Sequence, residues 1–392
     1  MTTLPPFIMT SEEGSFARQT IQERKPLIIK RILSHFDYTP TIRKSLKAFR
    51  SELANDPIQP LTEQTADRIH WDQDLQPWEG KTWLEIPWFL AETYFYRRVL
   101  ECITYFQPGP WQGQDPYELL KYREIQNAIP DFEEIYQPQG HHPTHERFCS
   151  ACLLALWGNR GDLSNLHVFE TDMSSQPENL VLDHTESAWE FLKSKPARIA
   201  YFLDNTGKEL LFDLAFIDFL LSSKLAKSIT CFLKNQPFFV SDAMPKDVEN
   251  SLHALRASEQ DEVRELARRM DAYFGRGLVT HKSPPFLTTS RMYRQLPEVF
   301  KNQLASHDLA ILKGDVNYRR LFGDRHWPPT TSISEAGGHF PTSVLSLRTL
   351  KAEIILGISQ QKFAELQGAG DPKWLINGKR GMVTFLKKES EK

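Results

Sequence analysis

The sequence predicts an α/β protein: a three-layer α/β/α sandwich with a doubly wound, largely parallel sheet, preceded by an N-terminal helical domain. From about Pro196 onward, short apolar runs end in polar clusters and alternate with amphipathic stretches, as in βαβ units. The preceding part has helical periodicity and many large aromatic side chains. At 392 residues the chain also exceeds the size at which single cores stop growing, so we expect two units, residues 1–185 and 186–392.

The composition is that of a water-soluble globular protein. Hydrophobic residues make up 40% of the chain and charged residues 25%, and the net charge is −3, so neither a membrane nor a nucleic acid is expected as a partner. No uncharged apolar run has the length of a membrane span, and Glu12 and Glu13 stand where a signal peptide needs an apolar core. We expect a cytoplasmic protein, with the nucleus as a second location, and we expect a monomer.

The part before residue 185 predicts helices separated by proline-bearing loops at 107–116 and 138–143. Its aromatic residues include Trp83, Trp88, Phe89, Tyr94, Phe95 and Tyr96. Glu92 and Arg97 lie among them, and we interpret these two as an exposed or intrahelical charged pair rather than as catalytic groups.

One helical stretch has the spacing of a metal site. His145, Cys149 and Cys152 fall on one face of a helix, a geometry that can hold zinc. Large apolar residues follow in the same stretch, so a buried helix with cysteines as small apolar residues is the favoured interpretation. Four cysteines in so long a chain predict no disulfide framework.

A polar segment, 156–164, follows this helix and has two open interpretations. It can be a helix end at Gly158 followed by a new helix cap at Asp162. Alternatively it reaches the active site, where Asn159 and Asp162 would contact a substrate.

In the second half of the chain, the apolar runs predict strands and the amphipathic stretches predict helices. The strands are expected at 199–203, 229–233, 238–241, 309–312, 344–347 and 382–386, and the helices at 210–221, 246–257, 259–274 and 350–366. Open doubly wound sheets bind ligands beyond the carboxyl ends of their strands. The residues that follow each run are therefore the candidates for function.

Oxygen-bearing side chains follow two of these runs. Asp204 and Asn205 come directly after the first strand, and Asp242 comes directly after the third. Carboxylate and amide oxygens suit Mg²⁺, Mn²⁺ or similar ions with open water positions. We predict that these three residues hold a catalytic metal ion that activates water, and that Glu209, in the first turn of the next helix, faces the same pocket.

Cationic residues follow two other runs and would balance the charge of a phosphate group. Segment 313–320 follows the fourth strand, and Arg348 and Lys351 follow the fifth. Asp315 and Asn317 would then be free to hold hydroxyls of an organic leaving group. Each residue alone has a plain alternative as a cap, a turn or a surface charge. The coincidence of several such clusters at strand ends is what favours a phosphatase.

At this point the residues match a known family. The chain resembles the damage-control phosphatases, first catalogued as a domain of unknown function, and specifically the subfamily marked by an Arg-Thr-x-Lys motif, here at 348–351. The other matching segments are 92–98, 156–164, 204–209, 241–242 and 313–321, in the family's order.

The resemblance implies a divalent ion of the manganese, cobalt, nickel or magnesium type and hydrolysis of sugar phosphates such as fructose 1-phosphate and fructose 6-phosphate. Pyrophosphatase activity is a further expectation. Asp204, Asn205 and Asp242 become the catalytic metal ligands, and Glu209 a pocket residue. Together with the charge argument, the expected substrate-binding residues are Asp315, Asn317, Tyr318, Arg319, Arg320, Arg348 and Lys351, with Asn159 and Asp162 from the matching segment 156–164.

Three alternatives stay open. Some proteins that this chain resembles have been described as S-adenosylmethionine-dependent methyltransferases of protein carboxyl groups, but the turn after Leu203 has no Gly-x-Gly-x-Gly run. A mechanism with Asp204 as the nucleophile would place a second Asp where this chain has Thr206. The third alternative is a non-catalytic module that binds phosphorylated metabolites.

Overall fold

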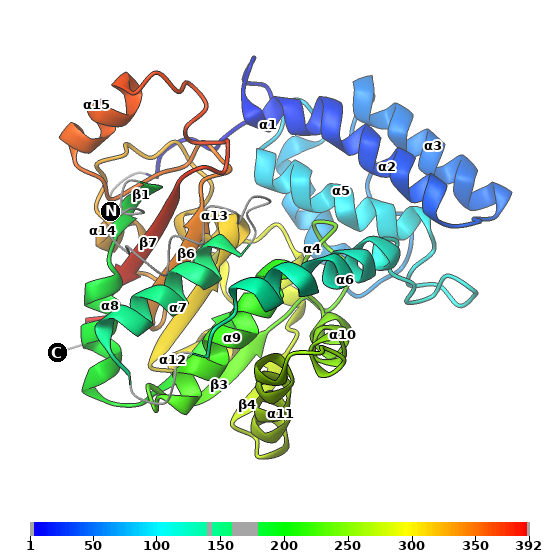
Figure 1. Ribbon diagram of the computed structural model, residues 1–392. Helices are drawn as coiled ribbons and strands as arrows, with labels where there is room; N and C mark the ends of the chain where they lie inside the picture. Colours follow the sequence, from blue (N-terminus) through cyan, green and yellow to red (C-terminus); the bar gives the residue numbers. More distant parts are fainter. Residues whose placement is uncertain (1–3, 139–142, 159–178, 390–392) are drawn as a thin grey trace.

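The computed structural model describes residues 4–138, 143–158 and 179–389. Its centre is a seven-stranded sheet with helices on both faces, and the blue and cyan helices of the N-terminal part lie to one side of these layers (Figure 1). The predicted α/β/α class, with a largely parallel sheet and an N-terminal helical part, is confirmed.

The strand order of the sheet is β1-β7-β6-β5-β2-β3-β4. β2 to β6 run parallel to one another, whereas β7 is antiparallel to β6 and parallel to β1. The bounds are Leu180–Asp183 (β1), Ala197–Phe202 (β2), Ala226–Phe232 (β3), Val279–Lys282 (β4), Leu309–Lys313 (β5), Ser343–Thr349 (β6) and Gly381–Leu386 (β7). The chain passes from β2 to β3 on one side and later forms β5 on the other. The order therefore reverses between β2 and β5, where doubly wound sheets bind ligands.

Two strands, β1 and β4, are absent from the sequence-based prediction. Each has four residues. β4 lies at the edge of the sheet, and only its first residue is buried. Such a strand has no apolar run to reveal it.

The strand predicted at 238–241 is wrong. Phe239 and Val240 have φ angles of 47° and 66°, so the backbone turns there instead of extending. The apolar side chains pack on the N-terminal helices, as the contact between the rings of Tyr96 and Phe239 shows, with centroids 5.1 Å apart. A short apolar run alone does not tell a strand from a loop that packs on another layer.

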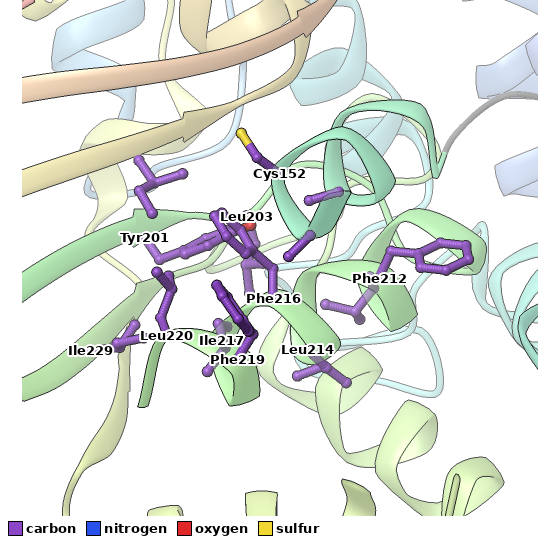
Figure 2. Packing of buried hydrophobic residues seen from close by; sticks show 14 of the residues in the cluster. Cys152, Tyr201, Leu203, Phe212, Leu214, Phe216, Ile217, Phe219, Leu220 and Ile229 are labelled. Carbon is purple, nitrogen blue, oxygen red and sulfur yellow. The ribbon is translucent and has the colours of Figure 1, made fainter. Parts of the chain in front are cut away.

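The central helix of one face is α9 (Lys208–Ser222), which is apolar nearly all round because other helices cover the side that does not face the sheet. Figure 2 shows Leu220 of this helix grouped with Tyr201 of β2 and Ile229 of β3. The other helices of this face are α6 (Glu118–Ile135), α7 (His145–Trp157), α8 (Thr185–Ser194), α10 (Pro245–Arg256) and α11 (Asp261–Gly275). The opposite face carries α12 (Glu298–Ala305), α13 (Gly314–Phe322) and α14 (Ile333–Gly337), with short 3-10 turns at Pro285–Thr288 and Tyr293–Gln295.

The N-terminal helices have a hydrophobic core of their own around α5 (Trp88–Cys102), which is buried along almost its whole length. The surrounding elements are α1 (Phe16–Gln19), a π-helical turn (Thr20–Arg24), α2 (Lys25–His35), α3 (Pro40–Asn55), α4 (Arg68–Leu75) and a 3-10 turn (Gln76–Trp78). The domain boundary near residue 185 stays a prediction. α6, α7 and β1 precede that residue and lie in the layers of the sandwich (Figure 1).

The helix predicted over 350–366 forms only as α15 (Gln360–Gly368). The carbonyls of Ala352 and Ile354 accept hydrogen bonds from the side chain of Arg348, at 3.3 and 2.7 Å. Gly357 has a φ of 81°, outside the helical region. Because a helix would need those carbonyls for its own N–H groups, residues 350–358 stay irregular.

None of the helices in the described ranges combines the length and the apolar character that crossing a membrane requires.

Candidate active site

A cavity of about 270 Å³ lies where the chain leaves β2, β5 and β6. Asp204, Asp315 and Lys351 line it from the sheet, and Trp88 and Glu92 line it from the N-terminal helices. The other residues around it are Phe16, Arg24, Leu156, Asn205, Glu209, Phe239, Ser241, Asp242, Gly314, Val316, Leu347 and Thr349. The sequence-predicted site residues that meet here are Asp204, Asn205, Glu209, Asp242, Asp315 and Lys351.

Backbone hydrogen bonds bring Asp242 next to Asp204 and Asn205. The loop after β3 turns back and pairs with the turn after β2, so that Asn205 lies opposite Asp242. The N–H of Ala243 donates to the carbonyl of Asp204 at 2.8 Å. Asp242 therefore reaches the site at the end of a loop, not at the end of a strand as the sequence predicts.

Gly314, the first residue of α13, lets Asp204 lie against the start of that helix. Its φ is +79°, and a Cβ added to it would overlap Oδ2 of Asp204. Both the conformation and the space therefore require glycine. The turn after β5 is shaped to receive a carboxylate.

Asp204 is the most isolated of the acidic groups. Its side chain is buried, and Oδ1 has no hydrogen-bond partner within the described residues. Burial raises the pKa of Asp204 well above its ordinary value, and the charges of Glu209 and Asp242 raise it further. A cation bound at Oδ1 would offset this unfavourable charge.

Asn205 joins Asp204 to two other side chains. Its Nδ2 donates to Asp204 Oδ2 at 2.9 Å and to Glu209 Oε2 at 3.0 Å, and its Oδ1 accepts from Ser241 Oγ at 2.6 Å. Holding a cation through Oδ1 requires the amide to turn over. Ser241 permits this because a hydroxyl accepts as well as donates.

Buried lysines balance part of the negative charge. Lys234 forms an ion pair with Asp242 Oδ2 at 2.9 Å, and Lys121 donates to the Asp242 carbonyl at 2.8 Å. Burial raises the pKa of Asp242, and these two cations act against that rise. Lys313 lies between Glu209 Oε1, at 3.2 Å, and Asp213 Oδ1, at 2.7 Å.

Sequence reasoning missed Lys234 and Lys121 as site residues. Lys234 directly follows the predicted strand 229–233, so its position at a strand end was an available signal. Lys121 belongs to α6, more than 100 positions before Asp242, and nothing in the sequence links the two.

The oxygen donors suit a hard divalent ion. Asp204 and Asp242 supply carboxylates, Asn205 supplies an amide oxygen, and Asp204 Oδ1 has no other partner within the described residues. Across those residues, no group of three or more His, Cys, Asp or Glu side chains is arranged to hold a metal ion. The third ligand would therefore have to be the Asn205 amide.

The histidine and cysteines of α7 have other contacts. His145 Nε2 lies 2.8 Å from Glu186 Oε2 and 3.2 Å from Cys149 Sγ. Cys149 and Cys152 are buried, and both are free thiols. These contacts match the interpretation of a buried helix.

Asp315 lines the cavity, but arginines hold its carboxylate. Oδ2 accepts from Arg319 Nε and Oδ1 from Arg348 Nε, both at 2.7 Å. Burial alone would raise the pKa of Asp315, but the two guanidinium groups hold it below its ordinary value. Asp315 thus fixes the start of α13, rather than standing free to bind hydroxyls as the sequence suggested.

The other residues expected to bind substrate are Asn317, Tyr318, Arg319, Arg320 and Arg348, and their contact with a substrate stays a prediction. All five are buried, and none of them lines the cavity. The physical reason is that their polar groups bond within the protein.

These internal partners are specific. Asn317 accepts from the Tyr293 hydroxyl and donates to the Lys313 carbonyl, and the Tyr318 hydroxyl accepts from the Leu356 N–H. Arg319 also pairs with Asp324. The other two arginines donate to backbone carbonyls: Arg320 to those of Leu287, Thr289 and Arg291, and Arg348 to those of Ala352 and Ile354. Through them, α13 and the segment after β6 are tied to the loops around the cavity.

Two cations of the cavity keep their charge available. Lys351, predicted from the sequence, and Arg24, which was missed, have no side-chain hydrogen bond or ion pair within the described residues. Arg24 lies in an N-terminal helix, and only the fold brings it to the site. Asn159 and Asp162 lie outside the described residues.

The interpretation of Glu92 and Arg97 as an exposed or intrahelical pair is wrong. Glu92 is 3% exposed and pairs with Lys25, and Arg97 is 1% exposed and pairs with Glu63 and Asp67. The one signal for Glu92 in the sequence was its place in a segment that resembles the family.

Comparisons of the sequence with known proteins identify one family. A model of the damage-control phosphatase ARMT1-like domain matches residues 20–366. Proteins named damage-control phosphatase ARMT1 are similar over nearly their full length: that of Rattus norvegicus is 31% identical over 98% of this chain and 99% of its own, and that of Danio rerio 30% identical over 97% of both. A crystal structure of a DUF89 family protein from Pyrococcus horikoshii covers 95% of this chain and 98% of its own, with a TM-score of 0.49 and 13% identity. On the family match and these relatives, the chain belongs to the ARMT1-like damage-control phosphatase family.

Proposed function

We propose that this protein is a metal-dependent phosphatase that hydrolyses sugar phosphates such as fructose 1-phosphate and fructose 6-phosphate, with pyrophosphate compounds as a further substrate class. One observation carries the proposal: a single cavity joins three oxygen donors, the buried Asp204 and Asp242 and the half-buried Asn205, to the ammonium of Lys351, which has no ion pair within the described residues. Membership of a damage-control phosphatase family supports it. The partner is then a small phosphorylated molecule, and we expect the protein to act as a monomer.

Each group has a role in this proposal. Asp204, Asn205 and Asp242 hold a divalent ion (Mn²⁺, Co²⁺, Ni²⁺ or Mg²⁺), which when bound supplies a Lewis acid for the phosphoryl group and an acidified water. Lys351 attracts and orients the phosphate oxygens. Without the ion, Glu209 accepts a hydrogen bond from Asn205 Nδ2 at 3.0 Å, and the amide gives up this bond when it turns to hold the ion through Oδ1.

The test is release of inorganic phosphate from a panel of sugar phosphates, with EDTA or with each of the four metal ions. We expect metal-stimulated turnover by the wild type and a loss of at least about 100-fold in kcat for Asp204→Asn and Asp242→Asn. Asp218→Asn is the matched control, because Asp218 is a buried carboxylate of α9 that pairs with Arg269 outside the cavity. It should keep the activity.

The same assay separates the alternatives. Folded Asp204→Asn and Asp242→Asn variants with full activity would refute the proposed site. Substrate binding without phosphate release would indicate a binding module. Labelling of a carboxyl group by S-adenosylmethionine, without phosphatase activity, would indicate the methyltransferase.

A further inference from the structure

Glu92 places a carboxylate on the wall of the cavity formed by the N-terminal helices. It belongs to α5, lines the cavity and is 3% exposed. Oε1 pairs with Lys25, whereas Oε2 is buried and has no hydrogen-bond partner within the described residues. An acceptor left without a donor in a buried site is unfavourable, and such groups call for an explanation.

Lys25 holds this carboxylate in place. It is fully buried, donates to the Tyr96 hydroxyl at 3.1 Å, and lies over the rings of Phe95 and Tyr96, 4.8 and 4.3 Å from their centroids. These contacts leave the ammonium little freedom to move. Glu92, a lining residue of the cavity, therefore keeps one oxygen committed to Lys25 and has the other without a hydrogen bond within the described residues.

The other carboxylates of the cavity have different partners. Asp315 is held by two arginines, Glu209 by Lys313 and Asn205, and Asp242 by Lys234. Three buried carboxylate oxygens of the described cavity lining lack a hydrogen bond: Asp204 Oδ1, Glu92 Oε2 and Asp242 Oδ2. Asp242 Oδ2 has an ion pair with Lys234 instead, so Asp204 Oδ1 and Glu92 Oε2 are the two with neither contact. Asp204 lies with the proposed metal ligands, and Glu92 belongs to the part of the lining that the N-terminal helices contribute.

We infer that Glu92 is a specificity residue that accepts hydrogen bonds from hydroxyl groups of the organic part of the substrate. This inference rests on the proposed phosphatase function and names the kind of ester that the site selects. A carboxylate accepts from hydroxyls and repels phosphate, so it favours an orientation with the phosphate toward Lys351 and the hydroxyls toward α5. The selected substrates are phosphate esters of polyhydroxylated molecules.

The experiment compares fructose 1-phosphate with p-nitrophenyl phosphate, which has no alcohol hydroxyl. We expect Glu92→Gln to lower the ratio of kcat/KM for fructose 1-phosphate over p-nitrophenyl phosphate by about 10- to 100-fold, mainly through KM, because substrate hydroxyls lose a charged acceptor. Glu52→Gln is the matched control: Glu52 is a buried glutamate that pairs with Arg98 of the same helix but does not line this cavity. It should leave the ratio unchanged.

Glu92→Gln alone leaves the buried Lys25 ammonium without its carboxylate, and this loss can unfold the protein. The double variant Lys25→Met with Glu92→Gln avoids this problem because it removes the ammonium as well. It should show the same fall in the ratio. A wild-type ratio in folded Glu92→Gln, or in the double variant if the single variant does not fold, would overturn the inference. Absence of wild-type turnover on both substrates would instead refute the proposed function.

Discussion

Among single residues, Gly314 determines the position of the Asp204 carboxylate, because only glycine leaves space for it. We expect Gly314→Ala to lower kcat/KM roughly 100-fold, because its Cβ would displace the Asp204 carboxylate. It should also lower the free energy of unfolding by about 1–3 kcal/mol, since alanine is strained at a φ of +79°. Phosphate release and urea unfolding measure the two effects.

The control for this prediction is Gly277→Ala. Gly277 has a φ of +67°, and an added Cβ there would meet nothing within 4 Å. It should show the backbone strain alone, with activity retained. Equal losses of kcat/KM in the two variants would contradict the role of Gly314.

The sequence predicted some site residues better than others for a physical reason. Asp204 and Asn205 directly follow a buried strand, and such positions lie at the ligand-binding edge of the sheet. A charge by itself does not reveal its partner. Arg320 and Arg348 looked as available as Lys351, but carbonyls that only the fold brings near occupy their guanidinium groups.

Arg348 connects elements: from β6 it reaches Asp315 of α13 and the carbonyls of the irregular segment after β6. We expect Arg348→Lys to lower the free energy of unfolding by on the order of 3 kcal/mol, because an ammonium cannot reproduce these directions and leaves buried acceptors without donors. Urea unfolding at neutral pH measures the loss.

Arg256→Lys is the matched control. Arg256 pairs with Glu249 and Asp271, but all three side chains are at least 36% exposed. Its replacement should change the stability by less than about 1 kcal/mol. Similar losses in the two variants would show that Arg348 does not tie these elements together.

Elements with a continuous apolar run or a clear helical period were predictable. β2, β5 and β6 lie within a few residues of their predicted positions, as do α9, α10 and α11. The loop at 238–241 and the segment at 350–358 were not, because contacts from distant residues fix their backbones. Such contacts leave no local periodicity.

For the whole molecule, the buried acidic groups predict that metal binding and stability are linked. Burial and neighbouring charges raise the pKa of Asp204, so a bound cation should favour the folded state. With Mn²⁺ at about 100 times its Kd, we expect the free energy of unfolding to rise by about 2.7 kcal/mol. Thermal unfolding with Mn²⁺ and with EDTA measures this rise.

Two variants make this prediction specific. Asp204→Asn should abolish the effect of Mn²⁺, whereas Asp218→Asn should keep it, because Asp218 pairs with Arg269 away from the cavity. The same shift in Asp204→Asn as in the wild type would place the bound ion elsewhere in the protein.

The overall architecture could be predicted from the alternation of apolar runs with amphipathic stretches and from the family resemblance. The contribution of the N-terminal helices to the cavity lining could not. Arg24 and Glu92 come more than 100 residues before Asp204 in the chain, and they line the same cavity only because the N-terminal helices pack on the sheet. Local patterns predict elements, whereas this shared cavity depends on how two hydrophobic cores are placed relative to each other.

The position of β7 in the sheet has a consequence for biosynthesis. β1 pairs with β7 within the described sheet, and Leu180 lies opposite Gly381, about 200 residues later in the chain. At a typical synthesis rate of about 5–20 residues per second, β1 waits roughly 10–40 s for its partner. During that time the nascent chain exposes an unpaired strand, so the order of synthesis makes this side of the sheet the part most in need of a chaperone.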